Sequence, residues 1–276
     1  MLIDTHAHLN FSAYKEDADE VIEKTLREDI FLINVGSQYS TSKRAVEMAE
    51  RYETGVWAAV GIHPLHLQKR NFSCQDDDEL EAVEIKTNGE EFNYQDYLEL
   101  AKKDKVVAIG EMGLDYHHFE EGDDEENLKK KQKEIFLQGI KLANEVRKPM
   151  MIHCWDAYDD LYEILKNNPV DKKGIIHSFV GSYKTAKKFI ELGYKIGLNG
   201  IITYGISYDR LIKEIDLQDI VLETDCPYLA PVPKKGERNE PKYVKYVAEK
   251  IAEIKEISLD EVKKQTTQNA KDLFKI

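Results

Sequence analysis

The sequence has few cysteines and no long apolar segment. Its three cysteines, Cys74, Cys154 and Cys226, form no CxxC pair and leave an odd number, so we expect reduced thiols rather than a disulfide framework. Apolar runs such as Val56–Ile62 and Val106–Gly110 are too short to span a membrane. Because the predicted strand Leu2–His8 begins at once, we expect no secretory leader. Together these features predict a cytoplasmic protein without a membrane partner.

Positive charge is also scarce. The chain has 39 Lys and Arg against 52 Asp and Glu, a net charge of −13. Proteins that grip long duplexes by their phosphates usually carry a basic face, and this composition argues against one. A polyanionic substrate would have to be attracted locally, for example by two divalent cations, which reverse the field at one point. We therefore expect an end or a short strand to bind better than a long duplex.

Eight short β-type runs alternate with segments of helical periodicity. Most runs are apolar without strict alternation, which is typical of parallel strands covered on both faces. The predicted strands are Leu2–His8, Phe31–Val35, Val56–Ile62, Val106–Glu111, Pro149–His153, Gly174–His177, Lys195–Asn199 and Ile220–Asp225. Eight βα repeats without a glycine-rich dinucleotide turn favour an α/β fold of the (β/α)8 TIM-barrel type over an open doubly wound sheet.

Apolar residues at helical spacing predict helices between and after these strands. The predicted helices include Thr41–Tyr52, Glu126–Arg147, Tyr183–Leu192 and two terminal helices outside the barrel, Pro241–Lys255 and Leu259–Phe274. Two acidic stretches, near residues 68–94 and 117–126, show little regular pattern and are predicted to be solvated surface insertions. The run Asp76–Glu79 lacks the spaced ligands and turn glycine of an EF-hand loop. We expect residues 1–276 to form one domain.

Histidines and carboxylates stand at the ends of the predicted strands. The set comprises His6, His8, His63, Glu111, His153, His177 and Asp225. The C-terminal ends of parallel barrel strands meet at one face, where barrel enzymes build their active sites. Alternation places His6 and His8 on one side of their strand, about 6.6 Å apart along it, so both can reach one metal ion.

Each of these residues, taken alone, could have a structural role instead of binding a metal ion. A single histidine at a strand end is usually packed or hydrogen-bonded, and an HxH pair also arises by chance. The whole set is harder to explain, because burying many ionisable groups together is costly unless a cation coordinates them. Imidazole and carboxylate without thiolate suit zinc, manganese, iron or magnesium. Six ligands suit two ions that share Glu111, while Cys154 and Cys226 are predicted to point away and pack.

The residues around this set resemble those of a known family. IDTHAHLN, GIHPLH, IGEMGLDY, MIHCWDAY, IIHSFVGS and LETDCPYLAPVPKKGERNEP are similar in order and spacing to the motifs of the TatD family of metal-dependent DNases, within the amidohydrolase-like barrels. The resemblance runs from Leu2 to about Asn269 and is weakest in the two acidic stretches.

The resemblance implies two divalent ions, magnesium, manganese or zinc, and assigns their ligands. One ion would be held by His6, His8, Glu111 and Asp225. The other would be held by Glu111, His153 and His177. Asp225 would also be the general base that takes a proton from the attacking water, and Glu111 would bridge the two ions.

Further residues are expected to contact the substrate. His63 resembles the family's contact with the substrate phosphate or leaving group; alternatively it packs under Pro64. Lys235, Arg238 and Asn239 follow the eighth strand and are expected to bind neighbouring phosphates. For Arg238 the alternative is a plain surface charge.

Two aromatic residues and two carboxylates complete the set of candidates. Trp155 and Tyr228 are placed to stack on a base beside the ions, with simple packing as the alternative. Glu223 and Asp115 are expected to orient ligands or loops.

The chain departs from the usual family pattern at several positions. Trp155 stands where arginine is common, Ser178 and Val180 change the sixth motif, and Lys235 replaces another frequent arginine. Lysine keeps the charge but cannot make a planar two-pronged contact with phosphate. All proposed metal ligands are present, so the departures concern substrate preference.

The function expected from these features is a metal-dependent deoxyribonuclease. It would hydrolyse phosphodiester bonds with a two-metal-activated water, exonucleolytically on DNA ends or single strands, with RNA as a second possible substrate and no obligate protein partner. The alternative is a hydrolase of acyl, ester or amide bonds, for example the ester of an aminoacylated tRNA. A third hypothesis is a module that binds nucleic acid or protein and whose metal site no longer supports catalysis.

Overall fold

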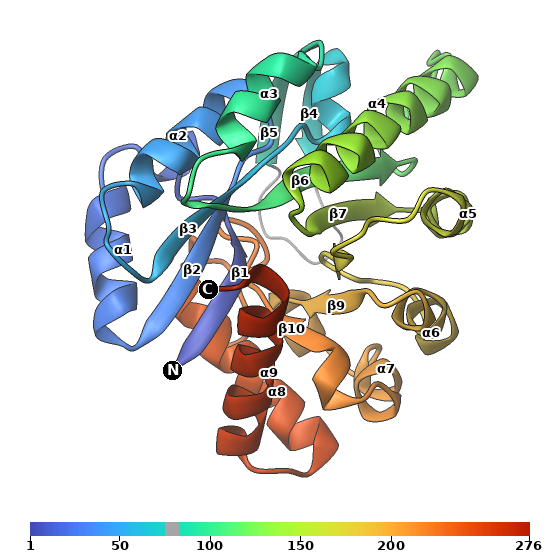
Figure 1. Cartoon of the computed structure of the whole chain (residues 1–276). Coiled ribbons are helices and arrows are strands. Elements are labelled where there is room, and N and C mark those ends of the chain that lie inside the picture. The colour runs from blue at the N-terminus through green and yellow to red at the C-terminus, as the bar shows by residue number, and fades with distance from the viewer. Residues whose placement is uncertain (75–82) are drawn as a thin grey trace.

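A parallel barrel forms the centre of the molecule (Figure 1). The computed structural model describes residues 1–74 and 83–276. The eight strands of its main sheet are, in spatial order, β1 (Leu2–Ala7), β2 (Ile30–Val35), β3 (Val56–Val60), β6 (Val106–Asp115), β7 (Met150–Trp155), β8 (Gly174–Ile176), β9 (Lys195–Leu198) and β10 (Ile220–Leu222). All are parallel to their neighbours, and a bridge between Ala7 and Cys226 joins the first strand to the chain after the last. The TIM-barrel prediction is confirmed.

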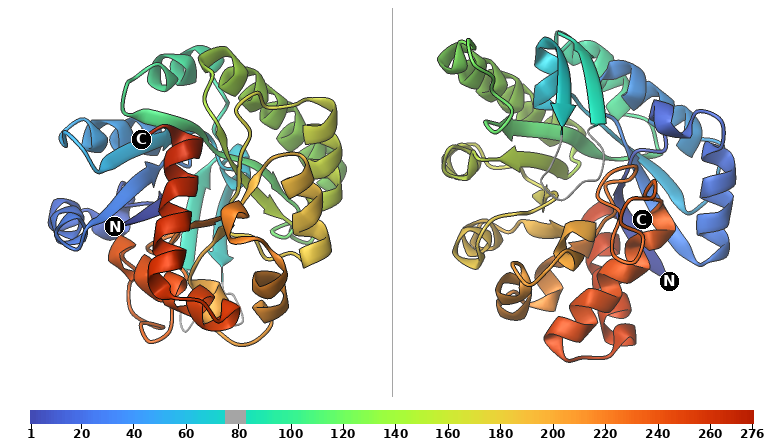
Figure 2. Two further views of the ribbon diagram at one scale, coloured as in Figure 1. Left: turned by 60° about the horizontal axis from the view of Figure 1, so that its bottom comes forward. Right: turned by 180° about the vertical axis from the view of Figure 1, so that it is seen from behind.

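Helices surround the barrel, as the periodicity predicts (Figures 1 and 2). They are α1 (Ala18–Arg27), α2 (Tyr39–Ala49), α3 (Tyr94–Ala101), α4 (Glu125–Val146), α5 (Tyr158–Asn167), α6 (Tyr183–Glu191), α7 (Asp209–Glu214), α8 (Val244–Lys255) and α9 (Leu259–Phe274). The predicted helix from Pro241 divides into a short 3-10 turn, Pro241–Tyr243, and α8. Across the described parts of the chain, no helix combines the length and apolar character needed to cross a membrane.

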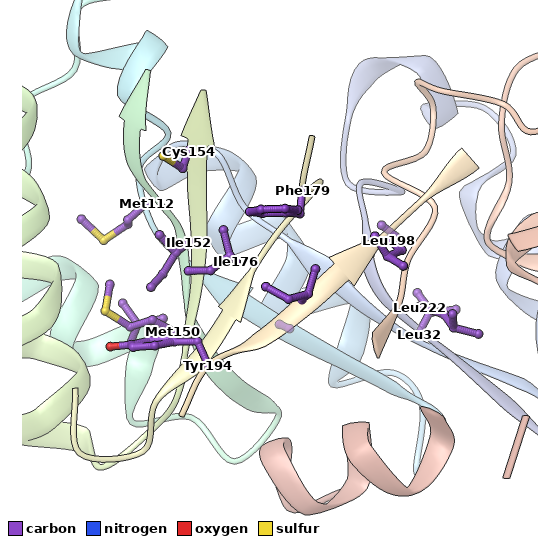
Figure 3. Close-up of a cluster of buried hydrophobic side chains, with 14 of the residues drawn as sticks. Leu32, Met112, Met150, Ile152, Cys154, Ile176, Phe179, Tyr194, Leu198 and Leu222 are labelled. Carbon is purple, nitrogen blue, oxygen red and sulfur yellow. The ribbon is translucent and has the colours of Figure 1, made fainter. Parts of the chain in front are cut away.

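The helix α9 closes one end of the barrel. Its Ala270 and Phe274 pack against a cluster inside the barrel that includes Ile3, Ile33 and Met151. A second and larger cluster lies between the strands and the helices. Figure 3 shows part of it, with labelled side chains Leu32, Met112, Met150, Ile152, Cys154, Ile176, Phe179, Tyr194, Leu198 and Leu222. With one end covered by α9, the other end carries the site.

The two predicted surface insertions differ in structure. Residues 68–94 contain an antiparallel hairpin, in which β4 (Lys69–Cys74) pairs with β5 (Val83–Asn88). These two strands were not predicted from the sequence, and the acidic run Asp76–Glu79 lies outside the described residues. The stretch 117–126 is mostly exposed, as predicted, and its Asp124 caps α4 by accepting a hydrogen bond from the backbone of Asn127.

Buried hydrogen bonds hold the first strand, β1, against the segment that follows the last strand, β10. The carboxylate of Asp4 accepts hydrogen bonds from the backbone N–H of Thr224 (2.9 Å) and from its hydroxyl (2.6 Å). The N–H of Asp225 donates to the carbonyl of His6 (2.8 Å), and the N–H of His8 donates to the carbonyl of Cys226 (2.9 Å). These bonds hold the end of β1 beside Asp225, which is the geometry the metal prediction requires.

Candidate metal centre

The predicted ligands meet at the C-terminal end of the barrel. Their nitrogen and oxygen atoms, together with those of the predicted substrate contact His63, form three overlapping groups, each within 4.8 Å: His6, His177 and Asp225; His6, His8 and Glu111; His63, Glu111 and His153. All of them except His6 line a pocket that opens between the loops following the strands. Residues from 6 to 225 therefore converge as the strand-end argument predicts.

One side of the site is formed by β1 and Asp225. The Nε2 atoms of His6 and His8 lie 3.2 Å apart, and the Nε2 of His8 lies 3.2 Å from Oδ1 of Asp225. The Nδ1–H of His8 donates to the carbonyl of Val35 at 2.8 Å, so the ring directs Nε2 toward the carboxylate. Imidazole nitrogens and a carboxylate oxygen gathered at these distances are the kind of donors that bind a divalent cation. The donor set therefore fits a metal ion.

Glu111 lies between the two sides of the site. Its Oε2 is 3.3 Å from Nε2 of His6, whereas its Oε1 is 2.9 Å from Nδ1 of His153 and 3.5 Å from Nε2 of His177. Burial alone raises the pKa of Glu111, but the surrounding imidazoles, led by His63, hold it well below its usual range. An ionised carboxylate with one oxygen toward each histidine group has the arrangement of a bridging ligand.

A buried carboxylate orients His177. Oε1 of Glu223 lies 3.1 Å from Nδ1 of His177 and also accepts the N–H of Ser178 at 2.6 Å. Burial lowers the pKa of His177, but Glu223 and Asp225 outweigh it and raise the pKa to about 10. Glu223 fits because Gly197 on β9 has no side chain: a Cβ there would lie 2.4 Å from Oε2 of Glu223. This contact leaves Nε2 of His177 to face the site.

Asp115 plays the same part for His153. Its Oδ2 lies 3.0 Å from Nε2 of His153 and 2.9 Å from Nδ1 of His118. Burial lowers the pKa of His153, but hydrogen bonds to Asp115 and Glu111 raise it to about 8. The strand β6 runs four residues beyond the predicted end, so Asp115 is the true end of the strand. His118, which lines the pocket, was not among the predicted site residues.

His63 enters the site with a defined tautomer. Its Nδ1 accepts the backbone N–H of Leu65 at 3.1 Å, and its Nε2 lies 3.6 Å from Oε1 of Glu111. Burial and the nearby His153 hold the pKa of His63 well below its usual range, so the ring is neutral. The proton of a neutral ring with an accepting Nδ1 is on Nε2. His63 therefore presents a donor to the site, although its position alone would permit ligation.

The structure does not bring the three predicted phosphate contacts into the pocket. Arg238 donates from Nη1 to Asp17 at 3.0 Å and covers the ring of Tyr14. Asn239 is fully buried, and its amide donates to the carbonyls of Thr224 and Tyr228. These two side chains fold the loop instead.

Lys235 lies 4.1 Å from the centre of the Tyr204 ring and is not part of the pocket wall. The two predicted aromatic residues, Trp155 and Tyr228, do line the pocket. Phe11 and His66 also line it and were missed. Phe11 stacks on His8 with ring centres 4.3 Å apart. A loop residue of this kind has no periodic signal in the sequence.

Comparison with known proteins agrees with this geometry. The family model described as TatD related DNase matches residues 3–275. The chain is 41% identical to the protein named uncharacterized metal-dependent hydrolase YabD of Bacillus subtilis, over 100% of both chains. It is 31% identical to deoxyribonuclease TATDN3 of Homo sapiens, covering 99% of this chain and 94% of that protein.

Solved structures of TatD proteins have the same fold as this chain. The crystal structure of YJJV, a TatD homolog from Escherichia coli K12, superimposes with a TM-score of 0.81 at 27% identity, covering 100% of this chain and 98% of that one. A hydrolase TatD family protein from Entamoeba histolytica, 24% identical, shares the fold with a TM-score of 0.81, over 99% of this chain and 97% of that one. Since the family model spans the whole barrel and every residue of the metal centre, this chain belongs to the TatD family.

Proposed function

We propose that this protein is a metal-dependent deoxyribonuclease that hydrolyses phosphodiester bonds at DNA ends or in single strands. The observation that carries the proposal is the position of Glu111, whose two carboxylate oxygens face different histidine groups. That arrangement suits a pair of divalent ions, the usual device for phosphodiester hydrolysis. The name of the human relative, a deoxyribonuclease, supports the same substrate class.

The proposed ligands follow from the two sides of the site. The first ion would be held by His6, His8, Glu111 and Asp225. The second would be held by Glu111, His153 and His177, with Glu223 and Asp115 orienting the two rings. When bound, magnesium, manganese or zinc in such a pair makes a water molecule more acidic and neutralises charge on the scissile phosphate.

Asp225 is proposed as the group that accepts the proton of the attacking water. Burial raises its pKa, but His177 and His8 outweigh this effect and lower the pKa to about 2, so the carboxylate is ionised at neutral pH. Its side chain is 15% exposed, compared with 5% for Glu111, so it is the more accessible of the two carboxylates. An ionised and accessible oxygen is what a proton acceptor needs.

His63 is proposed as the donor on the opposite side. Its Nε2–H points toward Glu111 and the open pocket, where it can donate to an oxygen of the phosphate or to the leaving oxygen. Because Leu65 occupies Nδ1, the ring cannot turn over to present a lone pair without breaking that hydrogen bond. The chain thus offers an acceptor, Asp225, and a donor, His63, on either side of Glu111.

The charge distribution favours a short contact with the substrate. The net charge is −13, and Arg238, which was expected to bind phosphate, forms an ion pair with Asp17. Attraction for a polyanion is then concentrated at the metal centre rather than spread over a face. This supports binding of an end or a single strand instead of a long duplex.

The test is a cleavage assay with a matched control. Protein stripped with EDTA is supplied with Mg²⁺, Mn²⁺ or Zn²⁺ and incubated with end-labelled single- and double-stranded DNA and RNA. Alongside run Glu111→Gln and, as control, Glu191→Gln, which changes an exposed residue of α6. We expect metal-dependent cleavage of DNA that Glu111→Gln abolishes and Glu191→Gln retains. Hydrolysis of acyl esters alone, or metal binding without turnover, would overturn the proposal.

A further inference from the structure

The side chain of Trp155 forms an aromatic surface beside the metal centre, and neighbouring side chains hold its ring in place. The ring of His117 stacks on the indole at 4.5 Å with an angle of 11°, and His118 meets it edge-on at 5.0 Å. His117 is itself held by Asp156, whose Oδ2 lies 2.8 Å from its Nδ1. An aromatic ring held in this way loses little side-chain freedom when a ligand stacks on it.

The strand β7 carries Trp155 toward the site. His153 and Trp155 are two positions apart on this strand, so both side chains leave it on the same side, about 6.6 Å apart along the backbone. Trp155 and His118 line the pocket, whereas His117 does not. The ring of His117 therefore covers the face of the indole that lies away from the pocket, and the indole itself contributes to the pocket wall.

The pocket combines two kinds of surface. Its floor consists of the ionisable side chains of the metal centre, while its wall beyond them is apolar and aromatic, with Leu65, Val180, Ile201, Leu229 and Trp155. A bare phosphate or a small acyl ester needs only the floor. A nucleotide presents both chemistries at once, an anionic phosphate and a flat base with an exposed π-face.

We propose that Trp155 is a specificity-determining residue, the platform on which an unpaired base next to the scissile phosphate stacks. This inference rests on the proposed nuclease function and sets its substrate class. A base that stacks on Trp155 has left its own helix, so the strand must be single at the point of cleavage. Double-stranded DNA is then cut only where its end frays.

Fluorescence tests base binding separately from catalysis. The chain has two tryptophans, and the other, Trp57, packs on Phe31 with ring centres 5.8 Å apart, against the cluster inside the barrel. In Trp57→Phe, all tryptophan emission comes from Trp155. We expect deoxyadenosine monophosphate to quench it saturably and 2-deoxyribose 5-phosphate, which lacks the base, to leave it unchanged. Equal responses to the two compounds would overturn the proposal.

Kinetics on a defined substrate test the same residue. Single-stranded oligonucleotides carry either a normal nucleotide or an abasic analogue beside the cleaved bond. For the wild type, removing the base should raise KM about 5- to 150-fold, the scale of one base–aromatic stack, with kcat less affected. Trp155→Ala should lose this discrimination and Trp155→Phe should keep most of it. Undiminished discrimination by Trp155→Ala would refute the assignment.

The two proposals fail in different ways. Selective quenching without any DNA cleavage would show that Trp155 binds a base, but it would remove the nuclease function and with it the role of Trp155 in cleavage specificity. Cleavage of DNA without base discrimination in either experiment would keep the nuclease and remove the platform.

Discussion

The backbone N–H of Leu65 donates to Nδ1 of His63 at 3.1 Å, and this hydrogen bond decides what His63 can do. With Nδ1 occupied as an acceptor, the proton of the neutral ring is on Nε2, the nitrogen that faces Glu111. A nitrogen that carries a proton donates hydrogen bonds and does not ligate a metal ion. His63 differs in this respect from His8, whose Nδ1–H donates to Val35, so that Nε2 is the nitrogen available to a metal ion.

The two histidines should consequently behave differently on substitution. His63→Ala should bind as much metal as the wild type but lower kcat about 100-fold or more, since it removes a proton donor. His8→Ala should lose metal as well as activity. Metal content by mass spectrometry after gel filtration, measured beside the cleavage rate, separates the two effects. Loss of one equivalent of metal from His63→Ala would show that His63 is a ligand.

The backbone at Asp225 provides a second test. Asp225 has a φ of 58°, in the left-handed region that Asp and Asn tolerate better than other residues with a Cβ. Asp225→Asn and Asp225→Ala both remove the charge, but only Asn keeps the conformational preference. We expect both to lower kcat by at least about 100-fold.

The same pair should differ in stability. In urea with EDTA present, Asp225→Ala should unfold with a free energy about 1 kcal/mol lower than that of Asp225→Asn. Equal stabilities would mean that the left-handed backbone contributes nothing measurable. A retained kcat in Asp225→Asn would remove this carboxylate from the role of proton acceptor.

Metal binding should depend on pH. In the metal-free protein the pKa of His153 is raised to about 8 and that of His177 to about 10, so both rings are protonated at pH 7. A metal ion requires bare nitrogens, so binding must release about two protons, one from each ring. Affinity should therefore rise with pH from 7, less steeply above 8, and level off above 10.

Calorimetric titration with Mn²⁺ checks this dependence. Buffers of different ionisation enthalpy at pH 7 report the number of protons released. Repeating the titration at pH 8.5 should give tighter binding and fewer released protons. An affinity that is constant over this range would contradict the assignment of His153 and His177 as ligands.

Gly197 offers a test at a distance from the ligands. Gly197→Ala places a methyl group 2.4 Å from Oε2 of Glu223 and must displace that carboxylate from His177. Loss of such an orienting contact typically weakens metal binding about 10- to 100-fold. Gly205→Ala is the matched control, because nothing lies within 4 Å of the added carbon there. If both variants bound Mn²⁺ equally well, Glu223 would have no orienting role.

Much of the centre could be predicted because strand ends carry their own signal. Short apolar runs locate parallel strands, and the C-terminal ends of such strands share one rim, so His6 and Asp225 could be placed together. Glu111 could be placed between the histidines for the same reason. Its neighbour Asp115 was harder to place, because β6 continues past the last apolar residues of the predicted strand.

The loops carry no comparable signal. Arg238 and Asn239 were expected to meet phosphate, but Arg238 pairs with Asp17 at the start of α1 and Asn239 is buried beneath its own loop. Which partner such a side chain finds depends on the path of the loop, and neither periodicity nor spacing determines that path. The hairpin of β4 and β5 was missed because its strands are rich in polar and charged residues rather than apolar ones.

The hydrogen bonds between Asp4 and Thr224 have a consequence for biosynthesis. The two residues are 220 positions apart, so nearly the entire polypeptide must leave the ribosome before they can meet. A nascent chain already displays His6 and His8 but has no Asp225 to complete their set. In the proposed centre, the ion assigned to His6, His8, Glu111 and Asp225 can therefore be fully coordinated only when translation is almost finished.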